Sequence, residues 1–421
     1  MKKMIYDRLT GRETSLAVIG LGYVGVPVAL RFARCFDVVG YDMDARRIEK
    51  LREKYGAGCG SIRFTSLEEE LSRAAFYIVT VLTPVDERKN PDLTCLVEAT
   101  RTVARYLKRG DYVVYESTVY PGCTEEVCVP LLEKGSGLKL GADFKVGYSP
   151  ERINPNDSEH TFSNTAKIVS ANDGQALDEV ARVYAEVVAA DLCRASGIRV
   201  AEAAKMTENV QRSVNIALMN ELQRLFSRMG IDMGEVIDMA SSKWNFVKYR
   251  PGLGGGHCIP VDPLYLVSAA SKLGVEMPVT SSDCAVTDGM AAYVVRSLLG
   301  AMGSDGRGAR ALLMGVTYKE NIDDIRNSRI AEMVGLLERE GMSVDVTDPH
   351  ADPDKVYAMY GIRPVPALRP PYDLIVVAVA HDEYRGLDDA YFRSISRGAA
   401  LLGDIRGLYK GRIKSLGYWS L

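Results

Sequence analysis

The amino-acid sequence predicts an α/β protein in which two doubly wound domains are joined by a helical central region with one long helix. Three observations lead to this prediction. Residues 16–130 alternate strand-like runs with amphipathic helical stretches, a helical spacing of apolar residues follows from about residue 200, and strand-like runs return after residue 308. Such alternation is typical of βαβ units and parallel sheets. A chain of 421 residues also exceeds what one hydrophobic core usually serves.

The first domain is expected over residues 1–199. Its predicted strands are LAVIG, DVVGYD, AFYIVTVL, DYVVYES and KVGY, and its predicted helices are VPVALRFARC, ARRIEKLREK and LVEATRTVARYLK. The helical region is expected over 200–303 and begins with a helix of about thirty residues, or ~45 Å. Such a helix can offer a face to a second subunit, so a homodimer is expected. The last domain, 304–421, contains ALLMGV, SVDVTD, DLIVVAVA and AALLGDI without a glycine fingerprint.

The composition excludes several classes of function. The net charge is −3, which predicts neither a nucleic-acid partner nor a membrane surface. The chain begins without an apolar targeting segment and contains no run of 18 apolar residues, so a cytoplasmic location is expected. Four histidines predict no metal site. The cysteines are scattered without CxxC pairs, which favours reduced thiols: Cys35, Cys59, Cys95, Cys123, Cys128, Cys193, Cys258 and Cys284.

A glycine-rich turn follows the first predicted strand. It reads IGLGYVGVPVALRFA and carries GxGxxG at Gly20, Gly22 and Gly25. These glycines permit a tight turn and close approach of a pyrophosphate to the N-terminus of the next helix. The run VVGYD places Asp42 about twenty residues further on, where a carboxylate can accept ribose hydroxyls. This context predicts a Rossmann-like dinucleotide site.

Charges near this turn bear on the choice of dinucleotide. Asp42 and the nearby Asp44 should repel a 2′-phosphate, so NAD is favoured over NADP. Arg47 is the opposing hint, and its alternative interpretation is a solvated charge on the following helix.

A second glycine-rich stretch, RPGLGGGHCIPVDP, contains Cys258. Glycines allow backbone and ligand to approach each other, and an accessible thiolate adds readily to an aldehyde. An inert loop cysteine is the alternative. Lys205 and Asn209 lie one helical turn apart, where they could hold an oxyanion or belong to a solvated helix face. Asp262 could order a water or pair with Lys205.

Several motifs occur in order along nearly the whole chain: GLGYVG, TPVDERKNPDL, ESTVYPGCTE, SPERINP, AEAAKMTEN, GGGHCIPVDP and GVTYKENIDDIRNS. In these motifs the chain resembles the UDP-sugar 6-dehydrogenases, which oxidise C6 of a UDP-hexose from alcohol to carboxylate with two NAD. Leu82 departs from the family's usual VPTP and gives VLTP, a change that concerns local loop packing.

The resemblance implies that Cys258 is the nucleophile of a covalent route through a thioester. The further catalytic residues that it implies are Lys205, Asn209, Asp262, Thr118 and Glu151. The cofactor-binding residues expected from the turn and the resemblance are Gly20, Gly22, Tyr23, Val24, Gly25, Asp42, Arg47, Thr83, Ser117, Thr118 and Arg326. The implied substrate-binding residues are Glu151, Arg152, Lys205, Asn209, Phe246, Lys248, Tyr249, Arg250, Gly255, Cys258 and Lys319.

Other interpretations of single residues stay open at this point. Glu151 would otherwise be a surface acid beside Arg152, and Thr118 a simple strand-end hydroxyl. Arg326 matches a family position that faces the nucleotide sugar, but it could equally form a structural salt bridge within IDDIR. His257 is expected to be structural.

SPERINP and GHCIPVDP look like the branch that acts on UDP-N-acetylhexosamines, so UDP-N-acetylglucosamine or its galacto epimer is the expected substrate. UDP-N-acetylmannosamine and UDP-glucose remain open, because epimers differ in one hydroxyl. By family analogy the product would serve surface polysaccharide synthesis. The alternative functions are a two-electron NAD dehydrogenase of the 6-phosphogluconate or hydroxyacyl type, and a non-catalytic NAD-binding regulator.

Overall fold

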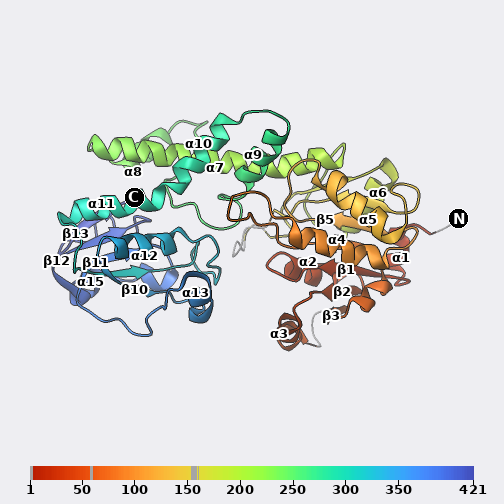
Figure 1. Ribbon diagram of the computed structural model, residues 1–421, viewed down its shortest axis with the longest axis horizontal. Coiled ribbons are helices and arrows are strands. Elements are labelled where there is room, and N and C mark those ends of the chain that lie inside the picture. Colours follow the sequence, from red (N-terminus) through yellow and green to blue (C-terminus); the bar gives the residue numbers. More distant parts are fainter. Residues whose placement is uncertain (1–2, 57–59, 153–158, 160) are drawn as a thin grey trace. The chain divides into compact units, whose positions relative to one another are not determined.

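The structure is a computed structural model that describes residues 3–56, 60–152, 159 and 161–421. Cys59 and the last three residues of the SPERINP motif lie outside the described residues. The chain forms two compact units (Figure 1). Unit 1 comprises Met1–Glu208 with Leu264–Val275, and unit 2 comprises Asn209–Pro263 with Glu276–Leu421.

Unit 1 is built on an eight-stranded sheet in the order β3-β2-β1-β4-β5-β6-β7-β8. Only the β6–β7 pair is antiparallel among the pairs described. The strands are β1 (Ser15–Ile19), β2 (Val38–Tyr41), β3 (Ile62–Thr65), β4 (Ala74–Val79), β5 (Tyr112–Tyr115), β6 (Lys145–Tyr148), β7 (Lys167–Ala171) and β8 (Leu192–Arg194). The first six follow the strand order of dinucleotide-binding domains, which places the ligand at the carboxyl ends of the strands.

Helices cover both faces of this sheet. They are α1 (Ile5–Thr10), α2 (Gly25–Phe32), α3 (Ala45–Tyr55), α4 (Thr94–Tyr106), α5 (Val129–Ser136) and α6 (Gly174–Ala185), with the short turns η2 (Glu68–Arg73) and η3 (Thr124–Cys128). Apolar side chains of α1, α2 and α6 share one core with alternate residues of β1 and β4, such as Val18 and Phe76. Helices α4 and α5 pack against each other (Figure 1), and Thr100 of α4 contacts Tyr115 of β5.

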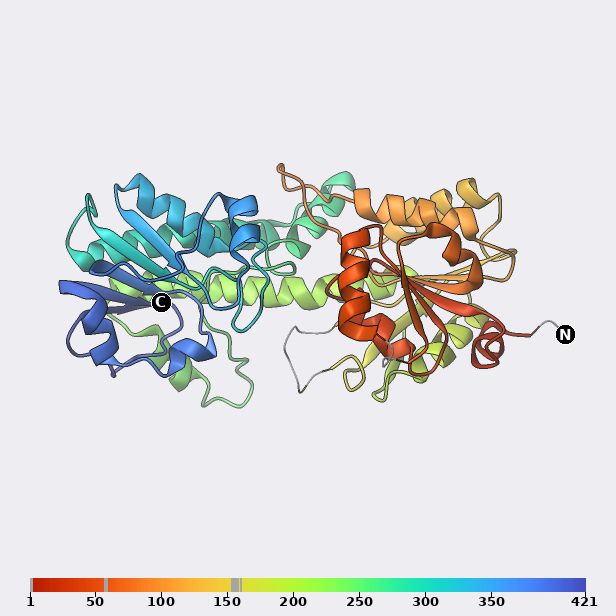
Figure 2. The same cartoon turned by 90° about the horizontal axis from the view of Figure 1, so that it is seen from below.

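Unit 2 contains a parallel sheet, which Figure 2 draws in teal to blue. The sheet has five strands in the order β10-β9-β11-β12-β13. Its strands are β9 (Arg310–Met314), β10 (Ser343–Thr347), β11 (Tyr372–Val377), β12 (Ser396–Asp404) and β13 (Gly417–Ser420). The helices around it are α11 (Met290–Met302), α12 (Arg329–Arg339), α13 (Pro353–Tyr360), α14 (Asp382–Arg385) and α15 (Asp389–Ile395). Helices α11 and α12 share a core with one face of the sheet, and α15 belongs to the core on the other. The prediction of a second α/β domain is therefore confirmed.

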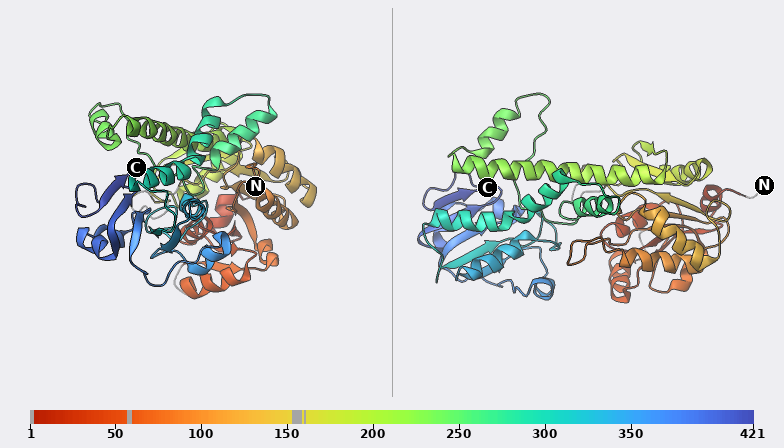
Figure 3. Two further views of the ribbon diagram at one scale, coloured as in Figure 1. Left: turned by 60° about the vertical axis from the view of Figure 1, so that its left-hand side comes forward. Right: turned by 45° about the horizontal axis from the view of Figure 1, so that its top comes forward.

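The predicted long helix is confirmed as α7 (Ile198–Arg228), which Figure 3 shows along its whole length. Three more helices follow it: α8 (Met233–Ala240), α9 (Asp262–Lys272) and α10 (Pro278–Asp288). Helix α7 begins in unit 1 and ends in unit 2. Among the described helices, none combines the length and apolar character needed to cross a membrane.

The sequence analysis missed four short strands: β3, β7, β8 and β13. The three domain ranges 1–199, 200–303 and 304–421 stay a prediction, since compactness divides the chain within α7 instead.

Candidate active site

The glycine turn between β1 and α2 forms a tight cradle. Gly20 has φ +92°, and a Cβ there would lie 2.7 Å from Val81 Cγ1. A Cβ on Gly25 would lie 1.9 Å from the carbonyl oxygen of Gly20, so only glycine fits where helix and turn meet. A Cβ on Gly22, in contrast, would meet only Arg47 Nη1, at 3.8 Å. The turn therefore leaves open space beside Gly22, as a pyrophosphate requires.

Asp42 lies at the end of β2 with its side chain only 9% exposed. Its Oδ2 accepts a hydrogen bond from Leu21 N at 2.9 Å, and its Oδ1 accepts one from Asp44 N at 3.0 Å. Arg47 Nη1 lies 3.4 Å from Asp42 Oδ2 and its side chain is 47% exposed, so its role toward the cofactor stays a prediction. A carboxylate has about four acceptor positions, and these contacts leave capacity for a ribose hydroxyl. The residues present therefore fit NAD.

The remaining residues of unit 1 that were predicted to bind the cofactor lie in the glycine turn itself or in the segments after β4 and β5. Tyr23 is 39% exposed, and Val24 is the residue before α2. Thr83 Oγ1 donates to the carbonyl of Thr118 at 2.7 Å, and Ser117 Oγ donates to the carbonyl of Val81 at 2.7 Å. These bonds tie the segment after β4 to the segment after β5, and they explain why hydroxyl residues occur there.

Helix α7 anchors the two loops of unit 1 that carry predicted catalytic residues. The buried Glu202 accepts hydrogen bonds from the backbone N–H groups of Gly122 and Thr124, in the segment after Thr118. Lys205 Nζ donates to the backbone carbonyl of Glu151 at 2.7 Å. These contacts fix both loops to one helix.

Burial decides between the interpretations that the sequence left open for the next residues. Glu151 is 8% exposed, and Lys205 and Asn209 are 7% and 4% exposed. The alternatives of a surface acid and a solvated helix face are therefore wrong. Arg152, which belongs to the predicted substrate set, forms an ion pair with Glu208 of α7.

The glycine-rich segment that carries Cys258, residues 250–263, lies in unit 2 and is called the cysteine loop below. Gly254 and Gly256 have φ values of +62° and +88°, which favour glycine. A Cβ on Gly255 would lie 2.8 Å from Tyr318 Cβ, and one on Gly256 would lie 2.7 Å from the Tyr318 ring. The sequence interpretation gave the glycines the task of making room for a sugar, but here they make room for Tyr318 of the VTYKEN segment. Cys258 itself is partly exposed.

The residues around Cys258 are held by α7 within unit 2. Asp262 begins α9, and its backbone N–H donates to the carbonyl of Cys258 at 3.0 Å. Asn209 Nδ2 donates to Asp262 Oδ2 at 2.5 Å, and Ser213 Oγ donates to the carbonyl of Ile259 at 3.3 Å. The sequence left two roles open for Asp262: ordering a water or pairing with Lys205. The structure shows Asp262 hydrogen-bonded to Asn209, a partner that neither role included.

Arg326 takes the structural role that the sequence left open. It donates two side-chain hydrogen bonds to Asp324, at 2.9 and 2.6 Å. His257 Nε2 lies 3.4 Å from the same carboxylate. Although burial opposes it, these two side chains hold the pKa of Asp324 well below its usual range. A contact of Arg326 with the cofactor or the nucleotide stays a prediction.

The segment before the glycine loop follows α8. Lys248 and Arg250 both pair with the exposed Asp238 of α8, at 2.8 and 3.4 Å. Tyr249 packs against a small core under α7 and α8. Phe246 is partly buried. The substrate contacts predicted for these four residues stay predictions.

The loop that carries Lys319 is supported by a group that the sequence analysis missed. The fully buried His381 accepts a hydrogen bond at Nδ1 from Asn321 N, at 3.0 Å. Its Nε2 lies 3.2 Å from both Thr317 Oγ1 and Asp348 Oδ2. Thr317 Oγ1 in turn donates to the carbonyl of Lys319. The sequence offered no signal, because His381 lies 60 positions from Asn321.

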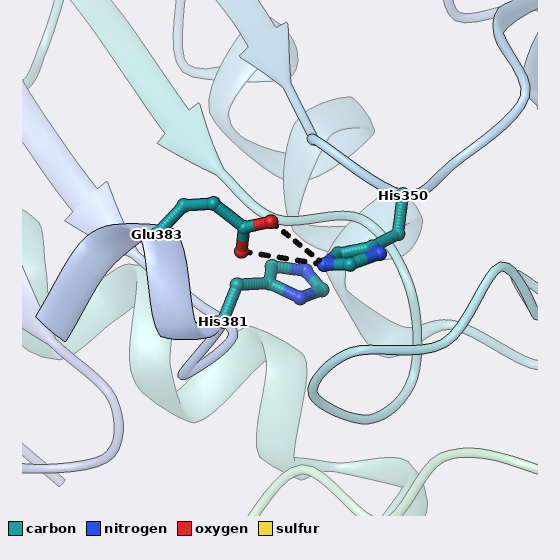
Figure 4. Close-up of side chains that lie close together, drawn as sticks. All are labelled: His350, His381 and Glu383. Atoms are coloured by element: carbon teal, nitrogen blue, oxygen red, sulfur yellow. Dashed lines mark hydrogen bonds and ion pairs between the residues drawn. The ribbon is translucent and has the colours of Figure 1, made fainter. Parts of the chain in front are cut away.

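His381 also belongs to a cluster with His350 and Glu383, whose side chains could approach a metal ion (Figure 4). His350 Nε2 lies 3.2 Å from Glu383 Oε1. Because His381 Nδ1 accepts a backbone N–H, its ring proton lies on Nε2, which faces Asp348. Neither nitrogen of His381 is thus available to a metal, and the cluster is better explained as a support for the Lys319 loop.

Comparisons with known proteins agree with this arrangement. Models of the UDP-glucose/GDP-mannose dehydrogenase family match in three parts: its NAD binding domain at residues 14–188, its central domain at 199–287 and its UDP binding domain at 312–411. A UDP-N-acetyl-D-glucosamine 6-dehydrogenase from Pseudomonas aeruginosa is 44% identical over 94% of this chain and 97% of its own length. The enzyme of the same name from Salmonella typhi is 43% identical over 94% of this chain and 96% of its own.

Solved structures give the same result. The structure of a UDP-D-ManNAc dehydrogenase from Pyrococcus horikoshii has a TM-score of 0.87 at 29% identity, and the match covers 96% of this chain and 98% of that one. The fold, the dinucleotide cradle and these similarities define an NAD-dependent dehydrogenase of UDP-sugars. The chain belongs to the UDP-glucose/GDP-mannose dehydrogenase family.

Proposed function

We propose that this protein oxidises C6 of UDP-N-acetylglucosamine from alcohol to carboxylate, with UDP-N-acetylgalactosamine as the second candidate substrate. The observation that carries this proposal is the 44% identity to an enzyme named for UDP-N-acetylglucosamine, against 31% for one named for UDP-N-acetylmannosamine. A family member named for NDP-N-acetylgalactosaminuronic acid is 30% identical. The glucosamine epimer is therefore the better supported.

NAD supplies the hydride acceptor for each of two oxidations, and Gly20, Gly22, Gly25 and Asp42 would hold it. In the first oxidation a base accepts the proton of the C6 hydroxyl while a hydride leaves C6, which becomes an aldehyde. The Cys258 thiolate then adds to C6 and forms a thiohemiacetal. Loss of a second hydride leaves a thioester on the sulfur.

The residues beside the reaction have complementary roles. We assign Lys205 and Asn209 to the negative oxygen of each tetrahedral stage, where a good donor contributes a few kcal/mol. Asp262 fixes Asn209 through their 2.5 Å hydrogen bond and so orients its amide. Thr118 and Glu151 serve the last step: water attacks the thioester carbon, its proton passes to Glu151, and the C–S bond breaks to release carboxylate and thiol.

Stoichiometry tests the proposal. Purified protein is incubated in turn with UDP-N-acetylglucosamine, UDP-N-acetylgalactosamine, UDP-N-acetylmannosamine and UDP-glucose, and NADH is counted against uronate. The expected result is two NADH per uronate, with the highest kcat/KM for UDP-N-acetylglucosamine. One NADH per sugar with release of aldehyde would instead support a two-electron dehydrogenase, and NAD binding without turnover would support a regulator.

The same proposal includes the nucleotide end of the substrate and the assembly. Lys319 and the segment from Phe246 to Arg250 are assigned to the UDP moiety, and Lys319 lies within the residues that match a UDP binding domain. Apolar side chains stand exposed near the end of α7, at Leu225 (53%), and in the turn after α8, at Trp244 (92%). They support a homodimer, which light scattering would test.

We place the reaction in surface polysaccharide synthesis at a cytoplasmic location, because a UDP-linked uronate is an activated building block for acidic glycans. Deleting the gene should remove an acidic amino sugar from the cell-surface glycan. An unchanged glycan composition would contradict this placement.

A further inference from the structure

Unit 1 contains a buried group of charges directly behind Glu151 that the reaction just proposed does not use. Lys167, the first residue of β7, has a side chain that is only 3% exposed. Its ammonium lies 2.9 Å from Glu116 Oε2, 3.2 Å from Glu151 Oε2 and 3.2 Å from the carbonyl oxygen of Pro150. One buried cation thus bridges two carboxylates from different loops.

Each neighbouring element contributes to this group. Tyr184 of α6 donates its hydroxyl to Glu116 Oε1 at 2.5 Å. The rings of Phe162 and Tyr184 lie 4.9 and 5.6 Å from the Lys167 ammonium. The titratable and charged groups described here are Glu116, Glu151, Lys167 and Tyr184. Burial is costly for a charge unless it is paired, so this group keeps a defined geometry.

Glu151 is fixed at both carboxylate oxygens. Its Oε2 faces Lys167, and its Oε1 accepts a hydrogen bond from Arg152 N at 2.7 Å. Its backbone carbonyl is held by Lys205 of α7. These contacts at both carboxylate oxygens and at the backbone carbonyl orient the Glu151 side chain.

We infer that Lys167 and Glu116 are positioning residues for the reaction, which hold the Glu151 carboxylate in place and balance its charge when it gains or loses a proton. The inference rests on the proposed function, in which Glu151 takes the proton of the hydrolytic water. With Glu151 protonated, the remaining Lys167–Glu116 pair is neutral overall. With Glu151 ionised as well, the group carries one net negative charge.

The two positioning residues therefore act in opposite directions. Lys167 favours the ionised carboxylate and Glu116 disfavours it, since like charges repel. Burial raises the pKa of Glu116 itself to about 7, although Lys167 opposes the rise. A carboxyl that titrates near neutral pH thus lies on the other side of Lys167 from Glu151.

The experiment compares four variants of the full chain with the wild type. Glu151→Gln is the reference for a blocked hydrolysis step. Lys167→Met and Glu116→Gln test the inference. Lys145→Met is the matched control, because Lys145 also forms a partly buried ion pair, with Asp173 at 2.7 Å. Lys145 is the first residue of β6, whereas Glu151 follows the last residue of that strand. Rapid mixing with UDP-N-acetylglucosamine and NAD measures early NADH formation, and mass spectrometry of the quenched reaction measures the adduct on Cys258.

Lys167→Met is expected to form early NADH normally, to slow thioester hydrolysis by about tenfold or more, and to accumulate the Cys258 adduct as Glu151→Gln does. Glu116→Gln, which is nearly isosteric, should keep turnover but move the acidic limb of the kcat–pH profile to lower pH by about one unit. A residue with a merely structural role would lower all rates together and leave this profile in place.

The inference is overturned if Lys167→Met hydrolyses the thioester as fast as Lys145→Met while Glu151→Gln accumulates it. It is equally overturned by a Glu116→Gln profile that superimposes on the wild type. If Lys167→Met does not fold, the Glu116→Gln profile decides alone. Failure of the proposed function looks different: either wild-type protein makes no uronate, or Glu151→Gln turns over without an adduct.

Discussion

The glycine turn allows a paired test, because Gly22 and Gly25 lie three residues apart but have opposite surroundings. A methyl group on Gly25 would lie 1.9 Å from the Gly20 carbonyl oxygen and 2.6 Å from Thr80 Oγ1. A methyl group on Gly22 would have only the end of the Arg47 side chain nearby, at 3.8 Å. Gly25→Ala should therefore damage the fold of the turn, whereas Gly22→Ala should damage only the space that NAD requires.

The magnitudes follow from these distances. Carbon and oxygen atoms pack at about 3.5 Å, so Gly25→Ala must move backbone atoms by roughly 1.5 Å. Such overpacking costs about 3 kcal/mol, which lowers the Tm of a unit of this size by about 6–12 °C. Gly22→Ala should change the Tm of the free protein by less than about 2 °C, but it should weaken NAD binding by about 10–100-fold, or ~1.4–2.7 kcal/mol.

Thermal unfolding without ligand and titration with NAD measure the two effects separately. The expected pattern is a destabilised Gly25→Ala and a stable Gly22→Ala with poor affinity for NAD. A Gly22→Ala variant that binds NAD like the wild type would refute the placement of the pyrophosphate beside Gly22. A Gly25→Ala variant as stable as Gly22→Ala would refute the reasoning from close contact.

Further predictions concern the reaction and its pH dependence. Cys258→Ser should lower uronate formation on the order of a thousandfold or more and abolish the covalent adduct, as mass spectrometry can show. Lys205→Met should lower kcat by about 10²–10³-fold with a smaller change in KM, and equal loss in both parameters would contradict an oxyanion role. Glu116 has a raised pKa of about 7 against 4.5 for an ordinary Glu, so the native state binds the extra proton and stability from this group is lost as pH rises from about 4.5 to about 7. Denaturant unfolding measures the stability of Glu116→Gln relative to wild type at about pH 5 and at about pH 8. This difference should shift in favour of the variant by on the order of 1–3 kcal/mol between the two pH values, and an unchanged difference would argue against the raised pKa.

Local patterns explain most of what the sequence could predict. The GxGxxG turn and Asp42 lie within one βαβ unit, so their spacing alone predicts how they meet. Helix α7 was predictable because apolar residues recur at helical spacing over many turns. The short strands β3, β7, β8 and β13 were missed, since segments of three to five residues give little periodic signal.

The parts of the site that sequence reasoning missed depend on contacts between distant segments. Lys167 lies 51 residues from Glu116 along the chain, and no local pattern marks a lone lysine as buried. Tyr318 is the nearest neighbour of Gly255 and Gly256, although it lies more than sixty residues further along the sequence. The sequence named Glu151, Lys205 and Asn209 as candidate catalytic residues. It could not predict that they are buried, because their burial depends on packing between distant segments.

Helix α7 carries Glu202 and Lys205, which hold loops of one unit, and Asn209 and Ser213, which hold the cysteine loop of the other. Each residue of an α-helix advances by about 100° around its axis, so these two sets of anchors share one angular phase. The boundary between the two units falls between these two sets of anchors, so each set holds loops of its own unit.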